Sequence, residues 1–126
     1  MIVPRGILFD LDGVVCEGEN LIHGANETLK KLQVAGIPYR FITNTSRMTK
    51  TNLIKSLGKM GLDVSLNSVF AAPQAAIEYC KLKEYIKMIL IVPDPEMKKD
   101  FSFFELVDDN SDVIVLGDMG RLFTFE

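Results

Sequence analysis

The chain opens with the stretch that decides its fold, Ile7-Leu8-Phe9-Asp10-Leu11-Asp12-Gly13. Three apolar residues followed by two acids and a glycine are typical of a short buried strand that runs into a turn. Because an extended chain alternates its side chains, Asp10 and Asp12 should both point to one side of the strand end. Two carboxylates about 4 Å apart repel by about 4 kcal/mol at an effective dielectric constant of 20. The sequence therefore predicts that a cation is bound at this strand end.

The type of cation follows from the residues around the two acids. Ligands that are all oxygens, in an open and partly hydrated site, favour Mg²⁺, which is commonly held by one or two carboxylates together with a substrate phosphate. Gly13 permits a tight turn that brings backbone N–H groups near the same point. A calcium loop is excluded, because the fifth, sixth and twelfth positions counted from Asp10 are Val14, Val15 and Leu21.

Beyond the first strand, segments with strand and helix periodicity alternate, and this order predicts an α/β fold with a parallel sheet. Ligands of such sheets bind beyond the carboxyl ends of the strands, where Asp10, Asp12 and Thr43 all fall. Thr43 and the amide of Asn44 can donate hydrogen bonds to a bound anion. The predicted elements are a helix over 25–36 that Gly36 ends, a strand over 37–42, a helix over about 50–60, a strand over 69–71 and a helix over 74–83.

The regular alternation of strand and helix patterns ends after Glu84. Strands are predicted over 87–92 and 112–117, and the pattern between them, up to Asn110, predicts no element. The last residues form an aromatic-rich stretch without a terminating signal. We therefore expect the chain to be the N-terminal portion of a longer protein.

The charge of the chain limits the kinds of molecule it is expected to bind, and its cysteine content indicates the cellular compartment. Of 126 residues, 14 are Lys or Arg and 17 are Asp or Glu, and this acidic balance argues against nucleic acid as a partner. Residues 1–63 form the more basic half of the chain, so an anionic ligand should bind to that half. Cys16 and Cys80 are too far apart in the sequence for a zinc motif and are expected to be reduced thiols of a cytoplasmic protein. No targeting or membrane-spanning segment is expected.

Several stretches resemble the haloacid dehalogenase (HAD) superfamily of Mg²⁺-dependent phosphatases. Residues 9–15 resemble its first signature, and Thr43-Asn44-Thr45-Ser46-Arg47 resembles its second. Residues 24–36 and 69–76 are similar to the capped, C2-type branch, and 112–117 resembles an early strand of its cap. That branch includes phosphoglycolate, pyridoxal-phosphate and nucleotide phosphatases and the phospholysine phosphohistidine inorganic pyrophosphate phosphatases.

The resemblance implies a Rossmann-like parallel sheet with helices on both faces over residues 1–84, followed by the beginning of an α/β cap, incomplete, over 85–126. It implies that Asp10 is the nucleophile that forms an aspartyl-phosphate and that Asp12 is the general acid and base. Asp10 and Asp12 would also hold Mg²⁺, Asp12 through its backbone carbonyl. Gly13, Thr43 and Asn44 would bind the phosphate of a small phosphorylated metabolite.

The sequence departs from the family pattern in its second half. The family also needs a Lys and one or two late acids; the nearest candidate acid is Asp118, but the positions four and five beyond it are Leu122 and Phe123. Three lysines, Lys81, Lys83 and Lys87, are interpreted as a solvated helix face and strand start. We therefore expect the chain on its own to be a poor phosphatase and, with an unpaired sheet edge, to self-associate.

Two alternative functions and two residue assignments stay open. The chain could be a non-catalytic phosphate-binding protein of the same fold, or a phospho-accepting receiver domain. Against the receiver, Leu11 separates the two early acids and the third strand ends in Ala71-Ala72-Pro73. Arg47 is either a substrate contact or an exposed loop cation, and the phenylalanines Phe101, Phe103 and Phe104 are either core or cap surface.

Overall fold

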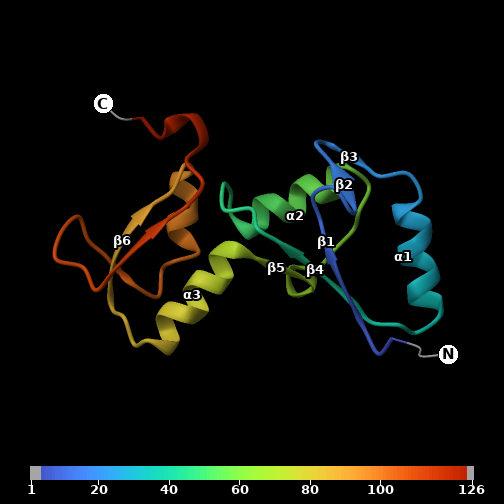
Figure 1. The fold of residues 1–126 in the computed structure, drawn as a ribbon, viewed down its shortest axis with the longest axis horizontal. Helices are drawn as coiled ribbons and strands as arrows, with labels where there is room; N and C mark the ends of the chain where they lie inside the picture. The colour runs from blue at the N-terminus through green and yellow to red at the C-terminus, as the bar shows by residue number, and fades with distance from the viewer. Residues whose placement is uncertain (1–3, 125–126) are drawn as a thin grey trace. The chain divides into compact units, whose positions relative to one another are not determined.

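The computed structural model describes residues 4–124, which fold into two compact units (Figure 1). The first unit comprises the chain up to Thr43 together with Thr51–Phe70, and the second comprises Asn44–Lys50 together with the chain from Ala71 onward. No helix among the described residues has the length and apolar character needed to cross a membrane.

The first unit is built on a three-stranded sheet of order β1-β4-β5, with β1 at Ile7–Asp10, β4 at Tyr39–Thr43 and β5 at Val69–Ala71. Strands β1 and β4 are parallel, and their register runs from Ile7 opposite Tyr39 to Asp10 opposite Ile42. The connections carry helices α1 (Ala25–Val34) and α2 (Lys50–Lys59) and a short 3₁₀ helix, η1 (Leu66–Ser68). The predicted α/β class with parallel strands is confirmed.

Both helices of the first unit pack on one face of its sheet. Right-handed crossovers that proceed in one direction along a sheet, as β1 to β4 to β5 does, leave their helices on the same side. Accordingly Leu29 of α1 and Leu57 of α2 share one core with Phe41 of β4, which is fully buried. The opposite face carries exposed apolar side chains from all three strands, Leu8, Ile42 and Phe70.

Helix α1 ends where its sequence predicts. Gly36 has a φ of +67°, a left-handed conformation that glycine adopts without strain. The amide of Gly36 donates to the carbonyl of Gln33 and that of Ile37 to the carbonyl of Leu32. These bonds satisfy the last turn and direct the chain into β4.

The loop after β1 folds around one backbone carbonyl. The carbonyl oxygen of Leu11 accepts hydrogen bonds from the amides of Val14 (3.3 Å), Val15 (2.9 Å) and Cys16 (3.0 Å). Gly13 lies inside this loop with a φ of +77°. The loop leads into a two-stranded antiparallel hairpin that the sequence did not predict, β2 (Cys16–Glu17) and β3 (Asn20–Leu21), since strands of two residues carry no periodic signal.

The second unit contains a separate parallel sheet of order β7-β6-β8. Its strands are β6 (Lys87–Ile91), β7 (Glu105–Leu106) and β8 (Val113–Leu116). The helices are α3 (Ala72–Leu82), η2 (Pro95–Lys99) and η3 (Gly120–Leu122). Helix η2 and strand β7 occupy the region for which the sequence predicted no element.

The core of the second unit decides the open assignment of the three phenylalanines. Phe101 and Phe104 are buried in one cluster with Met88 of β6 and Ile77 of α3, whereas Phe103 is exposed. Helix α3 belongs to this unit, although the sequence-based division placed it within residues 1–84. The assignment of residues 85–126 to an incomplete cap stays a prediction.

The positive φ of Gly13 generates a stability prediction. A Cβ at Gly13 would meet no atom within 4 Å, so the cost of Gly13→Ala comes from the backbone alone. We expect this variant to lose about 1–2 kcal/mol of unfolding free energy in urea titrations. The control is Gly58→Ala inside α2, also without a neighbour within 4 Å but without a positive φ, and it should gain about 0.5–1 kcal/mol. A neutral or stabilising Gly13→Ala would contradict the conformation of this loop.

A second prediction concerns Asp112, whose Oδ2 accepts hydrogen bonds from the amides of Ile86 (2.9 Å) and Lys87 (2.8 Å). These bonds, and next the charge of Lys87, lower the pKa of Asp112 below its ordinary 3.8. The stabilisation is therefore complete above pH 3.8 and is lost as the pH falls through the lowered pKa. We expect Asp112→Asn to unfold at lower urea than wild type at neutral pH, and the difference to vanish in acid.

Hydrogen exchange provides the local measurement for the same variant. The amides of Ile86 and Lys87 should exchange faster in Asp112→Asn than in wild type, while Asp109→Asn, a change at an exposed neighbouring acid, should leave them unchanged. Equal protection in all three proteins would show that Asp112 does not hold the start of β6.

Candidate active site

Asp10 is the last residue of β1, and its side chain is exposed at the carboxyl end of the strand. Its Oδ1 accepts a hydrogen bond from the amide of Leu11 at 2.8 Å. This bond fixes the carboxylate against the start of the loop. No ion pair involves Asp10 within residues 4–124, so its charge is not neutralised by a described side chain.

Asp12 is exposed as well, and between the two acids Leu11 is buried in the core. The backbone of Asp12 forms a bridge with Cys16, so the loop around the Leu11 carbonyl holds Asp12 in place. Its carboxylate makes no hydrogen bond or ion pair with any residue that the structure describes. The sequence analysis expected both acids to point to one side of the strand end, and the burial of Leu11 between two exposed acids is consistent with that.

The charges of both carboxylates act on the thiol of Cys16. Its thiol is buried and lies 3.5 Å from the carbonyl oxygen of Leu11. Burial raises the pKa of Cys16, and the charges of Asp12 and then Asp10 raise it further. All three effects favour the protonated thiol.

Gly13 provides the turn but not a free amide. Its N–H donates to the carbonyl of Cys16 at 2.8 Å, and the next three amides all donate to Leu11. The expected contact between the Gly13 amide and a phosphate therefore has no support in this geometry. Phosphate binding by Gly13 stays a prediction. What the structure shows is that Gly13 adopts a left-handed backbone conformation in the turn.

Thr43 ends the neighbouring strand β4 and is buried, on the same side of that strand as Phe41. The parallel register pairs Asp10 with Ile42, so Thr43 comes one residue beyond this pair at the same edge of the sheet. Asn44 follows directly in the chain, is exposed, and belongs to the second unit. The fold therefore brings the ends of β1 and β4 together, as the sequence predicted for Asp10 and Thr43.

The donor set at this edge fits one hard divalent cation. Within residues 4–124 no group of three or more His, Cys, Asp or Glu side chains could hold a metal ion. Two exposed carboxylates without a cationic partner match Mg²⁺, which keeps several waters and takes one or two protein carboxylates. A metal that requires a complete cage of protein ligands would not fit.

Asp118, the candidate late acid, is engaged inside the second unit. Its Oδ1 accepts from the amide of Gly120 at 2.9 Å, and its Oδ2 lies 3.8 Å from Nε of Arg47. The amide of Asp118 donates to Oγ of Ser46, also at 2.9 Å. Ser46 is a partner that sequence reasoning missed, because a contact between residues 72 positions apart leaves no periodic signal. Arg47 is exposed and paired with Asp118.

The three candidate lysines also have partners within the second unit. Lys81 lies 3.6 Å from Glu78 and 5.0 Å from the centre of the Phe103 ring. Lys83 lies 5.7 Å from the centre of the Tyr79 ring, and Lys87 acts electrostatically on Asp112. These contacts agree with the interpretation of the lysines as surface residues.

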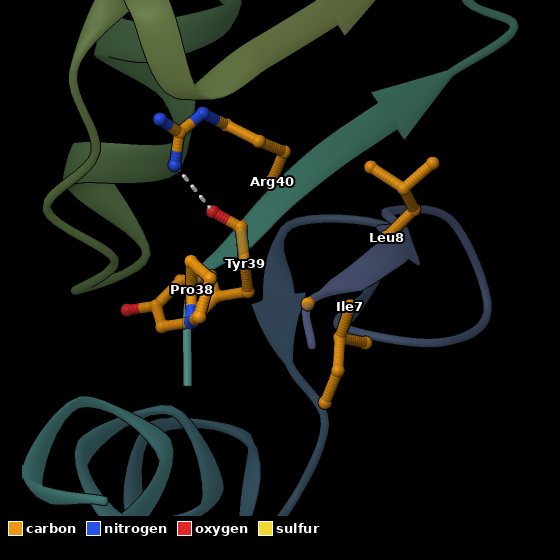
Figure 2. A pocket seen from close by; sticks show the side chains of 6 residues that line it. Ile7, Leu8, Pro38, Tyr39 and Arg40 are labelled. Carbon is orange, nitrogen blue, oxygen red and sulfur yellow. Dashed lines mark hydrogen bonds between the residues drawn. The ribbon is translucent and has the colours of Figure 1, made fainter. Parts of the chain in front are cut away.

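A pocket of about 370 Å³ lies at the opposite, amino ends of β1 and β4 (Figure 2). It is lined by Ile7, Leu8, Pro38 and Tyr39, and its one charged side chain, Arg40, turns back to donate to the carbonyl of Tyr39 at 2.8 Å. This pocket contains no acid, nucleophile or metal ligand. The chemistry-bearing residues of the first unit gather at the other end of the strands.

The end of the third strand, β5, argues against the alternative function of a phospho-accepting receiver domain. Strand β5 ends at Ala71, and α3 begins at Ala72. A receiver presents its phosphorylated aspartate at the end of this strand, where this chain has no acid.

Comparisons with known proteins show which family this chain resembles. A family model described as haloacid dehalogenase-like hydrolase matches residues 7–105. The phospholysine phosphohistidine inorganic pyrophosphate phosphatase of Danio rerio is 29% identical over 127 residues, covering 97% of this chain and 45% of that protein. The haloacid dehalogenase-like hydrolase domain-containing protein 2 of Rattus norvegicus is 32% identical over 114 residues, covering 90% of this chain and 43% of that protein.

Among solved structures, the 4-nitrophenylphosphatase of Thermotoga maritima is similar with a TM-score of 0.79 and 27% identity, covering 90% of this chain and 44% of that one. The chain thus spans less than half the length of these relatives. The family match covers most of the chain and includes both strand ends described above. The chain belongs to the haloacid dehalogenase-like hydrolase family.

Proposed function

We propose that this chain carries the nucleophile and the general acid and base of a Mg²⁺-dependent phosphomonoester hydrolase that acts through an aspartyl-phosphate. The observation that carries the proposal is the pair of exposed carboxylates, Asp10 and Asp12, held by one loop at the carboxyl end of β1 without a cationic partner among the described residues. The family match supports hydrolase chemistry at this place.

In the first step a carboxylate oxygen of Asp10 attacks the phosphorus of the substrate. A P–O bond forms to Asp10 and the ester P–O bond breaks, while protonated Asp12 gives its proton to the leaving oxygen. In the second step Asp12, now a carboxylate, takes a proton from a water molecule whose oxygen attacks the same phosphorus. The acyl-phosphate bond breaks, inorganic phosphate leaves, and Asp10 is regenerated.

Thr43 and Asn44 complete the proposed phosphate site. Their donors would stabilise the charge that develops on the phosphoryl oxygens, which is a large contribution in reactions of this type. The place of Thr43 at the end of β4, beside the end of β1, supports this role.

Mg²⁺ would be held by Asp10 and by Asp12 through its backbone carbonyl. When bound, the ion offsets the repulsion between the carboxylates and a phosphate dianion. The remaining contributions come from the chain itself: the loop around Leu11 fixes both acids, and burial of Leu11 orients their backbone.

The substrate we propose is a small phosphorylated metabolite. The relatives in Danio rerio and Thermotoga maritima are named as a pyrophosphate phosphatase and a 4-nitrophenylphosphatase. The cytoplasm is the proposed compartment, because both cysteines are free and buried.

One observation favours a second candidate, a phosphate-binding protein without turnover. Lys81 and Lys83 contact side chains of the second unit, and the acids of the first strand end have no third acid beside them within residues 4–124. The stabilising Lys and the late acids of the proposed mechanism are thus not evident in this chain. The two candidates differ in turnover and not in binding.

The first prediction of the proposal concerns the metal. Isothermal titration of the 126-residue chain with Mg²⁺ should show one site, and Asp10→Asn should weaken it by at least about tenfold, equivalent to about 1.4 kcal/mol. The reason is that Asp10 would be the carboxylate ligand of the ion, and a neutral amide would take its place. Asp63→Asn, a change at an exposed acid of the same unit, is the control and should bind as wild type. Equal affinity in all three proteins would remove the metal site.

The second prediction concerns turnover of p-nitrophenyl phosphate in a version of the protein that continues past Glu126 to the length of its relatives. Asp10→Asn should abolish turnover, because an amide is not a nucleophile. Thr43→Ala should reduce it by about 10²- to 10³-fold, the usual effect of removing one donor to a developing charge.

The 126-residue chain measured beside that version should be slow or inactive. Ordinary phosphatase rates in the short chain would assign the missing cationic role to one of its own lysines. A mild effect of Asp10→Asn together with full loss in Thr43→Ala would reverse the proposed roles.

A further inference from the structure

A cavity of about 270 Å³ in the second unit lies outside the proposed active site. It is lined by the first residue of α2, the last residue of β5, one side of α3 from Pro73 to Lys81, and Asp100, which follows η2. Its floor is apolar, with Pro73 and Ile77. Sites for drug-sized ligands occupy about 300–1,000 Å³, so this cavity fits a smaller molecule.

Gln74 brings a hydrogen-bond acceptor without a partner to this cavity. Its Oε1 is fully buried, and no donor reaches it among the residues that the structure describes. Buried polar atoms are nearly always paired, and Gln74 lines the cavity, so a turn of its side chain would offer this unpaired acceptor to an external donor. The donor must be an N–H or O–H group of a bound molecule.

Lys50 brings a cation without a partner to the same cavity. It is partly buried, and across residues 4–124 its ammonium has neither a hydrogen bond nor an ion pair; only its backbone amide reaches Oδ2 of Asp100, at 3.4 Å. Burial lowers the pKa of Lys50, and the charge of Asp100 opposes this shift. An anionic group beside Lys50 would compensate the lost hydration.

The other charges of the wall set the net charge of the ligand. Lys81 is paired with Glu78 at 3.6 Å and lies over the ring of Phe103. The wall as a whole contains two lysines and two acids, Lys50, Lys81, Glu78 and Asp100. A bare anion would leave Gln74 unpaired and add charge beside two carboxylates. A molecule with both an anionic end and a donating cationic end satisfies both unpaired groups and keeps the site neutral.

We propose that this cavity binds a free α-amino acid with an apolar side chain. The carboxylate lies on Lys50, the ammonium donates to Oε1 of Gln74 and faces Asp100, and the side chain packs on Pro73 and Ile77. This proposal does not depend on the phosphatase site, because none of these residues takes part in it.

The test uses the 126-residue chain and three matched probes, L-leucine, 4-methylpentanoate, which lacks the ammonium, and 3-methylbutylamine, which lacks the carboxylate. Binding is followed by NMR through the side-chain amide of Gln74 in ¹⁵N-labelled protein. L-leucine should shift that amide and bind at least about tenfold more tightly than either partial probe, since each loses one charge-assisted contact.

Variants separate the two contacts. Gln74→Leu, followed through the backbone amide of Ile77, should bind L-leucine at least about tenfold more weakly and 4-methylpentanoate unchanged. Lys50→Met should weaken both of these probes, while Lys55→Met, on the exposed side of the same helix, should change neither. Gln74→Leu replaces an unpaired buried acceptor by an apolar group, so its melting temperature should not fall, which separates lost binding from lost folding.

Three outcomes would overturn the proposal. They are the absence of L-leucine binding in the wild-type chain, equal binding of L-leucine and 4-methylpentanoate, and full L-leucine affinity in a folded Gln74→Leu variant. The last two would show that the Gln74 acceptor is satisfied by water and not by a ligand ammonium.

Discussion

The carbonyl oxygen of Leu11 accepts the amides of Val14, Val15 and Cys16, and the candidate site depends on this convergence. The three bonds reverse the chain directly after β1, which requires the left-handed backbone at Gly13. They also draw Leu11 and Cys16 into the core and leave the acids on either side of Leu11 exposed. The three bonds do not use the carboxylates: Oδ1 of Asp10 accepts from the amide of Leu11, and the carboxylate of Asp12 makes no hydrogen bond with a described residue.

The sheet adds the second element of the site through its register. Parallel pairing of β1 with β4 places Thr43 at the edge where Asp10 ends its strand. The same topology sends both crossover helices to one face of the sheet and leaves Leu8 and Ile42 exposed on the other. The relatives are more than twice as long as this chain, so the reaction of the whole protein is a proposal.

Much of this arrangement follows from the sequence, because it rests on local signals. Alternation predicted that Asp10 and Asp12 point to one side of the strand end, and both are exposed; the glycine after α1 predicted the helix end at Gly36. Contacts between distant segments were not predictable, such as the bond from the amide of Asp118 to Ser46, because they depend on packing and not on period. The hydrogen bond from the Gly13 amide to the carbonyl of Cys16 was not predicted either. A glycine in a motif indicates conformational freedom but not the direction of its N–H group.

The central claim is that Asp10 accepts the phosphoryl group, and chemical trapping tests it most directly. A version of the protein with the length of its relatives is mixed with p-nitrophenyl phosphate and Mg²⁺, quenched in acid and reduced with borohydride, which converts an aspartyl-phosphate into homoserine. Peptide mass spectrometry then locates the changed residue. The account predicts homoserine at position 10 and unmodified aspartate at position 12. Homoserine at another position, or none during active turnover, would contradict it.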